Sequence, residues 1–187
     1  MENPKIRQPI VTVCGHVDHG KTSILDCLRH SCVQAGECGG ITQKISFTSY
    51  PMSQMKAACP LIDKSGIKVN IPGFLLIDTP GHAAFTNLRK RGGSLADLAI
   101  LVVDINEGIK PQTAEVIQIL KLHKTPFLIA LNKIDNISGW RTNIDKPLKE
   151  SVESQGSNVK QVFDERYIVK IAISLLFLEL HLRILRH

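Results

Sequence analysis

The segment GHVDHGKT, residues 15–22, has the GxxxxGK[ST] spacing of a loop that binds phosphate groups. Its glycines let the backbone curl so that several N–H groups point at phosphate oxygens, and the helix expected after it adds the positive end of its dipole. The Lys21 ammonium can reach the terminal phosphates of a nucleotide, and the Thr22 hydroxyl can bind Mg²⁺. The alternative is a glycine-rich turn that ends in Lys-Thr by chance. We expect nucleotide contacts from Gly15, His16, Val17, Asp18, His19, Gly20, Lys21, Thr22 and Ser23.

A second segment, DTPG at residues 78–81, offers what a nucleotide site needs beside its phosphate loop. The Asp78 carboxylate, at the end of an apolar run, can hold the Mg²⁺ shell directly or through water. The Gly81 N–H can bond a γ-phosphate oxygen, because glycine tolerates such close approach of the backbone. The DxxG pattern is weak evidence alone, and it gains weight here because it follows a phosphate loop.

A third segment, NKID at residues 132–135, bears on the identity of the base. The Asp135 carboxylate has two acceptor oxygens, and guanine offers two adjacent donors, N1–H and the 2-amino group, both of which adenine lacks. A site built to bond one edge of a ligand rejects the analogue that lacks that edge. Asn132 and Lys133 would brace the loop and flank the ring. The three motifs in this order therefore favour GTP and GDP over adenine nucleotides.

Two further residues could take part in GTP hydrolysis. His82 follows the glycine expected at the γ-phosphate, so its ring can orient the attacking water, and positioning is what phosphoryl transfer most needs from a protein. A surface histidine at the start of a helix is the alternative. Thr42, within GGITQ at residues 39–43, could give Mg²⁺ a second hydroxyl when GTP is bound. A loop that the γ-phosphate orders and hydrolysis releases would act as a switch.

Short apolar runs alternate with amphipathic runs, and this order predicts the elements that position these residues. We expect strands at residues 10–14, 73–78, 97–105 and 125–133, with one helix after Gly20 and another from Pro111. Near-continuous apolar strands between helices predict an α/β fold with a mostly parallel sheet and helices on both faces. Ligands bind such sheets at the carboxyl ends of the strands, where all three motifs lie in the sequence.

Composition limits the classes of protein that fit. The chain has 187 residues, of which 43% are apolar and 21% charged, as in a globular protein with one sizeable core. A formal net charge of +6 suits a partner with phosphates, and a solvated basic surface explains it equally well. No signal peptide is visible, and the longest apolar run is too short to span a bilayer. Five cysteines without metal-binding spacing indicate reduced thiols, so we expect a cytoplasmic protein with no membrane partner.

The motifs together resemble those of a known family. GHVDHGKT, GGITQ, NKID and the long run from Asp78 to Thr113 are similar to the G domain of the translation initiation factor 5B family, the archaeal and eukaryotic counterpart of bacterial initiation factor 2. Gln43 distinguishes the switch segment from the GITI that is usual in elongation factors. The resemblance covers roughly residues 8–165. It implies a P-loop NTPase three-layer sandwich over residues 10–187, after an N-terminal extension at residues 1–9.

The resemblance also implies a function. Members of this family are GTPases that the ribosome stimulates and that promote subunit joining at initiation. By position, it assigns His82 as the catalytic group, Thr22 and Thr42 as magnesium ligands, and Asp135 as the guanine reader. A monovalent cation, K⁺ or Na⁺, would lie near Asp18 and the carbonyl of Gly40. The implied partners are GTP and GDP, large-subunit ribosomal RNA, and initiator tRNA through domains missing from this sequence. We expect a monomer.

The sequence departs from the family near its C-terminus. A fifth guanine-contacting loop, usually beginning Ser-Ala, should follow a further strand, and no such loop is visible. The run from Phe163 to Leu182 has helical spacing, although IAIS at residues 171–174 could be the strand itself. We therefore expect a G domain without its last strand and helix, as in a fragment, a truncated gene product or a frameshifted one. Two alternatives stay open: a nucleotide-binding module without activity, and the G domain of another translational GTPase, such as a selenocysteine-specific factor.

Overall fold

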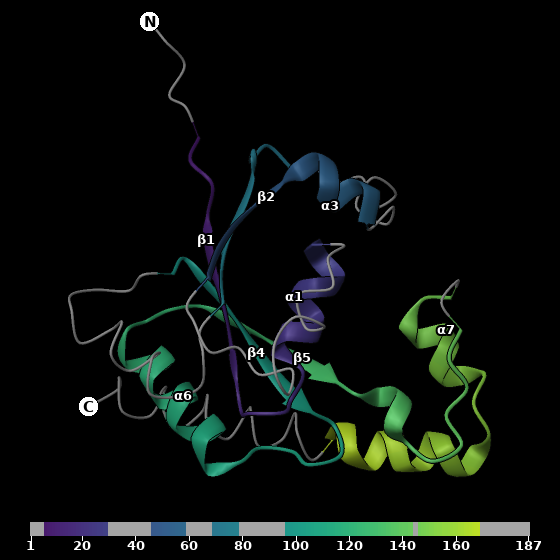
Figure 1. The fold of residues 1–187 in the computed structure, drawn as a ribbon. Coiled ribbons are helices and arrows are strands. Elements are labelled where there is room, and N and C mark those ends of the chain that lie inside the picture. The colour runs from purple at the N-terminus through teal and green to yellow at the C-terminus, as the bar shows by residue number, and fades with distance from the viewer. Residues whose placement is uncertain (1–5, 30–45, 59–68, 79–95, 144–145, 169–187) are drawn as a thin grey trace, which may run out of the picture. The chain divides into compact units, whose positions relative to one another are not determined.

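The computed structural model describes residues 6–29, 46–58, 69–78, 96–143 and 146–168 of the chain, as Figure 1 shows. The chain divides into two compact units. The first unit is made of Met1–Val102 and Pro111–Ala130, and the second of Val103–Lys110 and Leu131–His187. The predicted site residues are therefore divided between the units, with the phosphate loop in the first and NKID in the second.

A five-stranded sheet has the order β2-β3-β1-β4-β5. Its strands are β1 (Ile10–Gly15), β2 (Ser46–Pro51), β3 (Gly73–Asp78), β4 (Leu98–Asp104) and β5 (Phe127–Asn132). Strand β1 is parallel to both of its neighbours, β3 and β4, whereas the edge strand β2 is antiparallel to β3. Strands β1, β3, β4 and β5 match the four predicted runs to within two residues at each end. The predicted mostly parallel sheet is thus confirmed.

The alternation of side chains along β1 explains how the first unit packs. Val11 and Val13 join a core that includes Leu25 of α1 (Lys21–Arg29), and Met55 of α3 (Met52–Ala58) packs against it. The other predicted helix is α6 (Pro111–Leu122), which buries Thr113, Val116, Ile117 and Leu120. Figure 1 shows α1 and α3 on one side of the sheet and α6 on the other. Helices therefore cover both faces of the sheet, as predicted.

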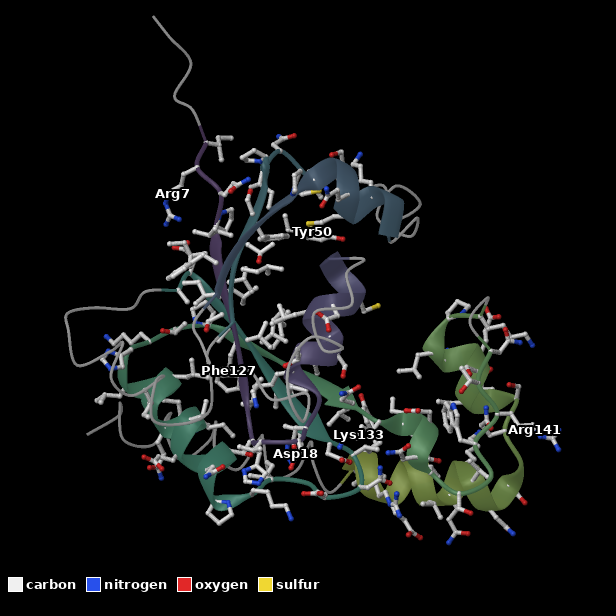
Figure 2. The ribbon with its side chains drawn as sticks, in the orientation of Figure 1. Arg7, Asp18, Tyr50, Phe127, Lys133 and Arg141 are labelled. Atoms are coloured by element: carbon white, nitrogen blue, oxygen red, sulfur yellow. The ribbon has the colours of Figure 1, made fainter. Side chains whose placement is uncertain are left out.

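Among the described residues of the first unit, two elements are not predicted by the sequence pattern, β2 and α3. Strand β2 reads SFTSYP, in which Phe47 and Tyr50 are the only large apolar side chains. Tyr50, labelled in Figure 2, is 2% exposed and anchors the strand to the core, whereas Phe47 is 63% exposed. Because a six-residue edge strand with one buried anchor has little apolar periodicity, the sequence gives no clear signal for it.

The second unit has an apolar core of its own. Its buried centre is Ile105, Ile137 and Phe163, with Trp140 and Val159 among the side chains packed around it. The indole of Trp140 lies 5.8 Å from the ring of Phe163, and the two planes are tilted by 36°. This core connects the chain after β4 with the chain after β5, because Ile105 follows β4 while Ile137 and Trp140 follow β5.

The remaining elements of the second unit are short. They are the 3-10 turn η2 (Ile134–Asn136), α7 (Leu148–Glu153) and a helix over residues 157–168. The predicted helical spacing from Phe163 onward is confirmed as far as Ile168, and the rest of that prediction falls outside the described residues. Among the helices that are described, none has the length and apolar character needed to cross a membrane.

Candidate functional site

The phosphate loop, residues 15–22, forms a sharp turn between β1 and α1. Gly15 has a φ of +148°, and a Cβ atom there would lie 2.3 Å from the carbonyl oxygen of Val102, so no other residue fits. The φ angle is also positive at Asp18 (65°) and Gly20 (86°). Aspartate is one of the few residues besides glycine that adopt a left-handed backbone readily, so Asp18 and Gly20 together suit this path of the loop. A fixed path of this kind is what a site made of backbone N–H groups requires.

Lys21 ties the two ends of the phosphate loop together. Its ammonium Nζ donates a 2.7 Å hydrogen bond to the carbonyl oxygen of His16. Lys21 is 8% exposed and Thr22 is 5% exposed, and both lie in the first turn of α1. A buried ammonium and a buried hydroxyl are stable only where oxygen atoms surround them. The first turn of α1 therefore supplies the two side-chain groups that a magnesium nucleotide would need.

Two histidines pack against each other within the phosphate loop. The rings of His16 and His19 meet edge to face, with their centroids 5.1 Å apart. His19 is fully buried, and its Nδ1 lies 3.4 Å from the carbonyl oxygen of Val102. The His19 side chain therefore supports the loop from the protein interior, and a nucleotide contact from this residue would come from its backbone. Asp18, labelled in Figure 2, and Ser23 are exposed.

Strand β3 brings Asp78 to the end of the sheet where the phosphate loop begins. Strands β1 and β3 are parallel, and Asp78 is paired with Val13, two residues before Gly15. Parallel strands end at the same edge of the sheet, which is where ligands of α/β folds bind. This is the position predicted for the magnesium carboxylate. Four other predicted site residues lie outside the described part of the chain and stay predictions: Gly40, Thr42, Gly81 and His82.

The base loop, residues 132–135, follows β5 in the second unit. Lys133 has φ 60° and ψ 37°, a left-handed conformation, and it is the N-cap of η2. Asp135 lies in the first turn of η2 with an exposed side chain, and Asn132 is half-buried. The N–H of Ile105 donates a 3.0 Å hydrogen bond to the carbonyl of Asn132, which fixes the start of the loop. The exposed carboxylate is thus available to a ligand.

Asp104, the last residue of β4, contacts the base loop and lies in none of the three sequence motifs. Asp104 is 3% exposed, and its Oδ2 lies 3.1 Å from Nζ of Lys133. Burial raises the pKa of the Asp104 carboxyl, but hydrogen bonds from the Asn106 backbone and from Lys133 outweigh burial, so the pKa lies below its ordinary value. The signal that could have revealed it is its place, because a carboxylate ends the apolar run of β4 as Asp78 ends that of β3.

Gln155 fastens the chain that follows the base loop. Its Oε1 accepts a 2.8 Å hydrogen bond from the N–H of Arg141, and its Nε2 donates one of 2.8 Å to the carbonyl of the same residue. The same Nε2 also donates to the carbonyl of Ser151 in α7 at 2.9 Å. Gln155 is 8% exposed, so these bonds are sheltered from water. One side chain thereby joins α7 to the segment at Arg141.

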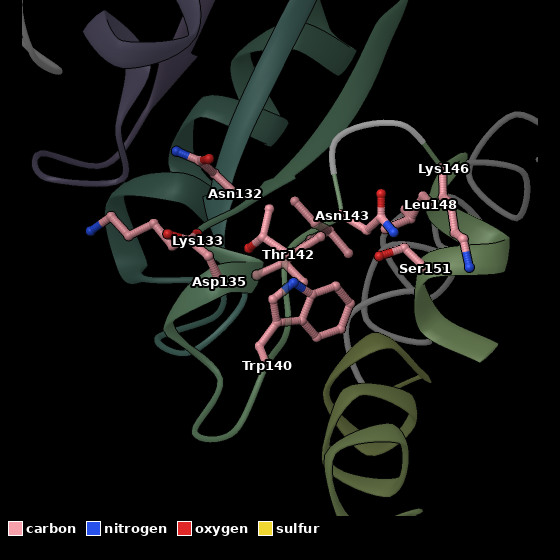
Figure 3. A pocket seen from close by; sticks show the side chains of 11 residues that line it. Asn132, Lys133, Asp135, Trp140, Thr142, Asn143, Lys146, Leu148 and Ser151 are labelled. Carbon is pink, nitrogen blue, oxygen red and sulfur yellow. The ribbon is translucent and has the colours of Figure 1, made fainter. Parts of the chain in front are cut away.

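A pocket of about 440 Å³ opens beside the base loop, as Figure 3 shows. Its lining includes Asn132, Lys133, Asp135, Trp140, Lys146 and Ser151. The volume is within the range of small-molecule sites, which combine apolar walls with a few polar groups. The pocket therefore offers room for a heterocyclic base next to the carboxylate that is predicted to read it.

The family assignment follows from a comparison with models of protein families. Residues 6–177 match the model described as the elongation factor Tu GTP binding domain. The chain belongs to this family of GTP-binding domains. The match extends over both units and includes the phosphate loop and the base loop. It confirms the resemblance to translational GTPases that the motifs indicate.

Relatives in this family are archaeal initiation factors. The chain is 52% identical over 165 residues to the probable translation initiation factor IF-2 of Methanopyrus kandleri, which covers 88% of this chain and 28% of that protein. A crystal structure of GDP-bound aIF5B from Aeropyrum pernix has 54% sequence identity and a TM-score of 0.69, and covers 86% of this chain and 27% of that one. The GTP-binding domain described here is thus similar to the G domain of archaeal IF-2, and the chain spans little more than a quarter of these relatives.

A more distant solved structure concerns one of the alternatives. A bacterial selenocysteine-specific elongation factor, EF-Sec, matches with a TM-score of 0.55 and 23% identity, covering 90% of this chain and 24% of that one. A likeness at this level of identity reflects the shared fold alone. The initiation-factor branch is therefore favoured by the comparisons over the selenocysteine-specific one.

Proposed function

We propose that this GTP-binding domain binds GTP and GDP with Mg²⁺ and hydrolyses GTP as the G domain of a translation initiation factor. The observation that carries the proposal is the phosphate loop: a backbone that only glycine permits at Gly15, followed by the buried Lys21 and Thr22 at the start of α1. A loop of this shape binds phosphates through N–H groups, a helix dipole and one ammonium. The base loop adds guanine selectivity through Asp135.

The residues present fit Mg²⁺. The predicted ligands are the hydroxyls of Thr22 and Thr42 and the carboxylate of Asp78, and hard oxygen donors of this kind are what Mg²⁺ prefers. Thr22 is buried in the first turn of α1, and Asp78 ends the strand beside β1. When bound, the ion would neutralise the phosphate charge that grows during phosphoryl transfer. A monovalent cation near Asp18 and the carbonyl of Gly40 is part of the same proposal.

The proposed catalytic group is His82, which would orient the attacking water. In the wider role that the family resemblance implies, ribosomal RNA stimulates hydrolysis and subunits join around initiator tRNA; the archaeal relatives named as translation initiation factors support this role. The contact with initiator tRNA would be made by domains that this sequence does not include. Such a role would take place in the cytoplasm.

Nucleotide binding tests the proposal directly. Titration of the purified chain with fluorescent GDP, GTP and ADP, each with Mg²⁺, should give binding of both guanine nucleotides at least about 100-fold tighter than that of ADP. Asp135→Asn replaces one of the two acceptors that face the base with a donor, which matches the N1–H and 2-oxo groups of xanthine, so the variant should prefer xanthosine diphosphate over GDP. Equal affinity for GDP and ADP in the unaltered chain would refute the proposed function.

Turnover separates an enzyme from a binding module. We expect slow GTP hydrolysis by the chain alone and faster hydrolysis with archaeal ribosomes. His82→Ala should bind GTP normally and lose ribosome-stimulated turnover by about 10²-fold or more, because positioning of the water is lost. Normal binding with no hydrolysis in the unaltered chain would instead identify a nucleotide-binding module.

A further inference from the structure

We propose that Asp104 and Asn106, from the turn after β4, are positioning residues for base recognition: they hold Lys133 so that Asp135 can bond the purine edge. The inference rests on the proposed function and names residues that none of the three sequence motifs contains. All the atoms involved belong to the second unit.

Lys133 holds the base loop in an unfavourable backbone conformation. Its φ of 60° is left-handed, which costs a residue other than glycine about 1–2 kcal/mol, yet Lys133 directly precedes the 3-10 turn that contains Asp135. If Lys133 relaxed to an ordinary φ, the turn Ile134–Asn136 would begin in another direction and would take the Asp135 carboxylate with it. Something outside the loop must therefore stabilise Lys133 in this state.

Asp104 holds the side chain of Lys133. Its Oδ2 lies 3.1 Å from the lysine Nζ, while its Oδ1 accepts hydrogen bonds from the backbone N–H of Asn106 at 2.7 Å and of Glu107 at 3.4 Å. Two backbone donors therefore fix the carboxylate independently of its contact with Lys133. With the carboxylate almost fully buried, the ion pair is far less screened than a surface pair.

Asn106 holds the main chain of Lys133. Its Nδ2 donates a 3.1 Å hydrogen bond to the Lys133 carbonyl oxygen, across 27 residues of sequence. Arg166, from the helix over residues 157–168, donates to the Oδ1 of the same amide. A guanidinium has no acceptor, so the amide must face Arg166 with its oxygen and Lys133 with its NH₂ group. Arg166 thus orients the amide that steadies the strained residue.

The turn after β4 therefore holds Lys133 in two places: Asp104 pairs with its ammonium, and Asn106 bonds its carbonyl. A base that bonds Asp135 needs the carboxylate within a few tenths of an ångström of one place, whereas the phosphates are bound elsewhere in the chain. Loss of these two contacts should weaken recognition of the base and leave the contribution of the phosphates to nucleotide affinity unchanged. Guanine recognition is the property in which the positioning role can be separated from a general effect on folding.

Asn106→Asp is the most selective test. The carboxylate keeps an acceptor for Arg166 and has the shape of the amide, but it cannot donate to the Lys133 carbonyl. The probes are GDP and inosine diphosphate, which differ only in the 2-amino group that Asp135 would bond. We expect the variant to bind GDP about tenfold more weakly, with a smaller loss for inosine diphosphate, so that the ratio between the two affinities falls. The unfolding midpoint should stay close to that of the unaltered chain.

Two further variants complete the experiment. Asp104→Asn keeps an oxygen for the backbone donors and removes the charge that faces Lys133, so the same ratio should fall. Glu107→Gln is the matched control: it removes a charge from the same turn, where Glu107 pairs with Lys110 at 3.2 Å, and the ratio should not change. If the unaltered chain binds GDP no better than ADP, the proposed function fails and the positioning role with it. If it prefers GDP and neither Asn106→Asp nor Asp104→Asn lowers the ratio, the positioning role alone is overturned.

Discussion

In the phosphate loop the backbone fixes the geometry, whereas in the base loop distant side chains do so. Gly15 meets the carbonyl of Val102 so closely that its lack of a side chain determines the path of the loop, and Lys21 closes the loop from five residues away. The base loop instead depends on Asp104 and Asn106 and, through Asn106, on Arg166, which is 60 residues further along. The first loop is largely specified by its own sequence, and the second by the fold around it.

The difference follows from what each loop binds. Phosphate oxygens are alike on every nucleotide, so a loop of inward-pointing N–H groups is sufficient and a short glycine-rich segment can provide it. A base must be distinguished from similar bases, so one carboxylate has to be placed accurately, and accurate placement requires support from several elements. We therefore expect substitutions in the two loops to fail in different ways.

The largest effect is expected from a methyl group added at Gly15 in the phosphate loop, compared with one added at Gly139 near the base loop. Gly15→Ala puts a Cβ atom 2.3 Å from a backbone oxygen, so a strand must move. We expect the free energy of unfolding to fall by about 3–5 kcal/mol. We also expect the variant to lose nucleotide binding. Gly139→Ala is the counterpart near the base loop. Its φ is +84°, but the closest atom is a methyl of Val159 at 3.1 Å, which can shift, so the loss should be about 1–2 kcal/mol.

Urea unfolding measures both variants. A loss of unfolding free energy in Gly15→Ala at least twice that in Gly139→Ala would show that the backbone constrains the phosphate loop more tightly than the region of the base loop. Equal losses would mean that the phosphate loop is no more tightly constrained by its backbone than the segment after the base loop.

The same difference explains what the sequence could predict. The phosphate loop is recognisable because its determinants, Gly15 and Lys21, are close together in the chain and have few substitutes. Strands β1, β3, β4 and β5 are recognisable because each is a nearly continuous apolar run, as in LAILVVD of β4, which is largely buried. The match of residues 6–177 to a family of GTP-binding domains agrees with the function that these local signals indicate.

The rest could not be predicted because its determinants are distant in sequence. Asn106 is an ordinary polar residue after a strand, and only its contact with Lys133 gives it a role. Gln155 has no motif around it, yet it satisfies both backbone groups of Arg141. Strand β2 was missed because a single anchor, Tyr50, carries its burial. Pattern analysis detects periods and local motifs, whereas these features depend on pairings across the fold.

A smaller effect is expected from Gln155→Leu, which tests whether distant side chains hold the region of the base loop. Leucine fills a similar volume but leaves the N–H and carbonyl of Arg141 without their partner. An unsatisfied backbone group in a sheltered site costs about 1–3 kcal/mol, so we expect a loss near 2 kcal/mol and faster hydrogen exchange at the Arg141 amide. Arg141 follows Trp140, a wall of the pocket, so GDP affinity should also fall.

Gln161→Leu is the matched control for this variant. Gln161 is an exposed glutamine whose Nε2 donates to Glu165 at 3.0 Å within one helix. Its replacement should change the unfolding free energy by no more than about 0.5 kcal/mol. Similar losses of unfolding free energy from both variants would show that the Gln155 bonds with Arg141 contribute no more to stability than an exposed side-chain hydrogen bond.

The smallest effect is expected at the opposite end of β1 from the phosphate loop, where an exposed ion pair ties residue 7 to the sheet. Arg7 Nη1 donates to Asp97 Oδ2 and Nη2 to Oδ1, each at 2.6 Å, and the N–H of Ile10 donates to Asp97 at 2.8 Å. The hydrogen bonds from Arg7 and Ile10 lower the pKa of Asp97 from 3.8 to about 2. Figure 2 labels Arg7 beside the start of β1.

The sign of the pH dependence follows from that shift. The folded-state pKa of Asp97 is below the unfolded one, so its contribution is fully present above about pH 4 and is lost as the pH falls toward 2. The Arg7 side chain is 68% exposed and that of Asp97 is 39% exposed, so solvent screens the pair and the contribution is small. The difference in unfolding free energy between the unaltered chain and Asp97→Asn should shrink on acidification and in high salt. GDP affinity at neutral pH should be unchanged in Asp97→Asn, since the ion pair and the phosphate loop lie at opposite ends of β1. A loss of GDP affinity in this variant would mean that modest destabilisation alone weakens nucleotide binding, and the contrast between the two loops would then need a different explanation.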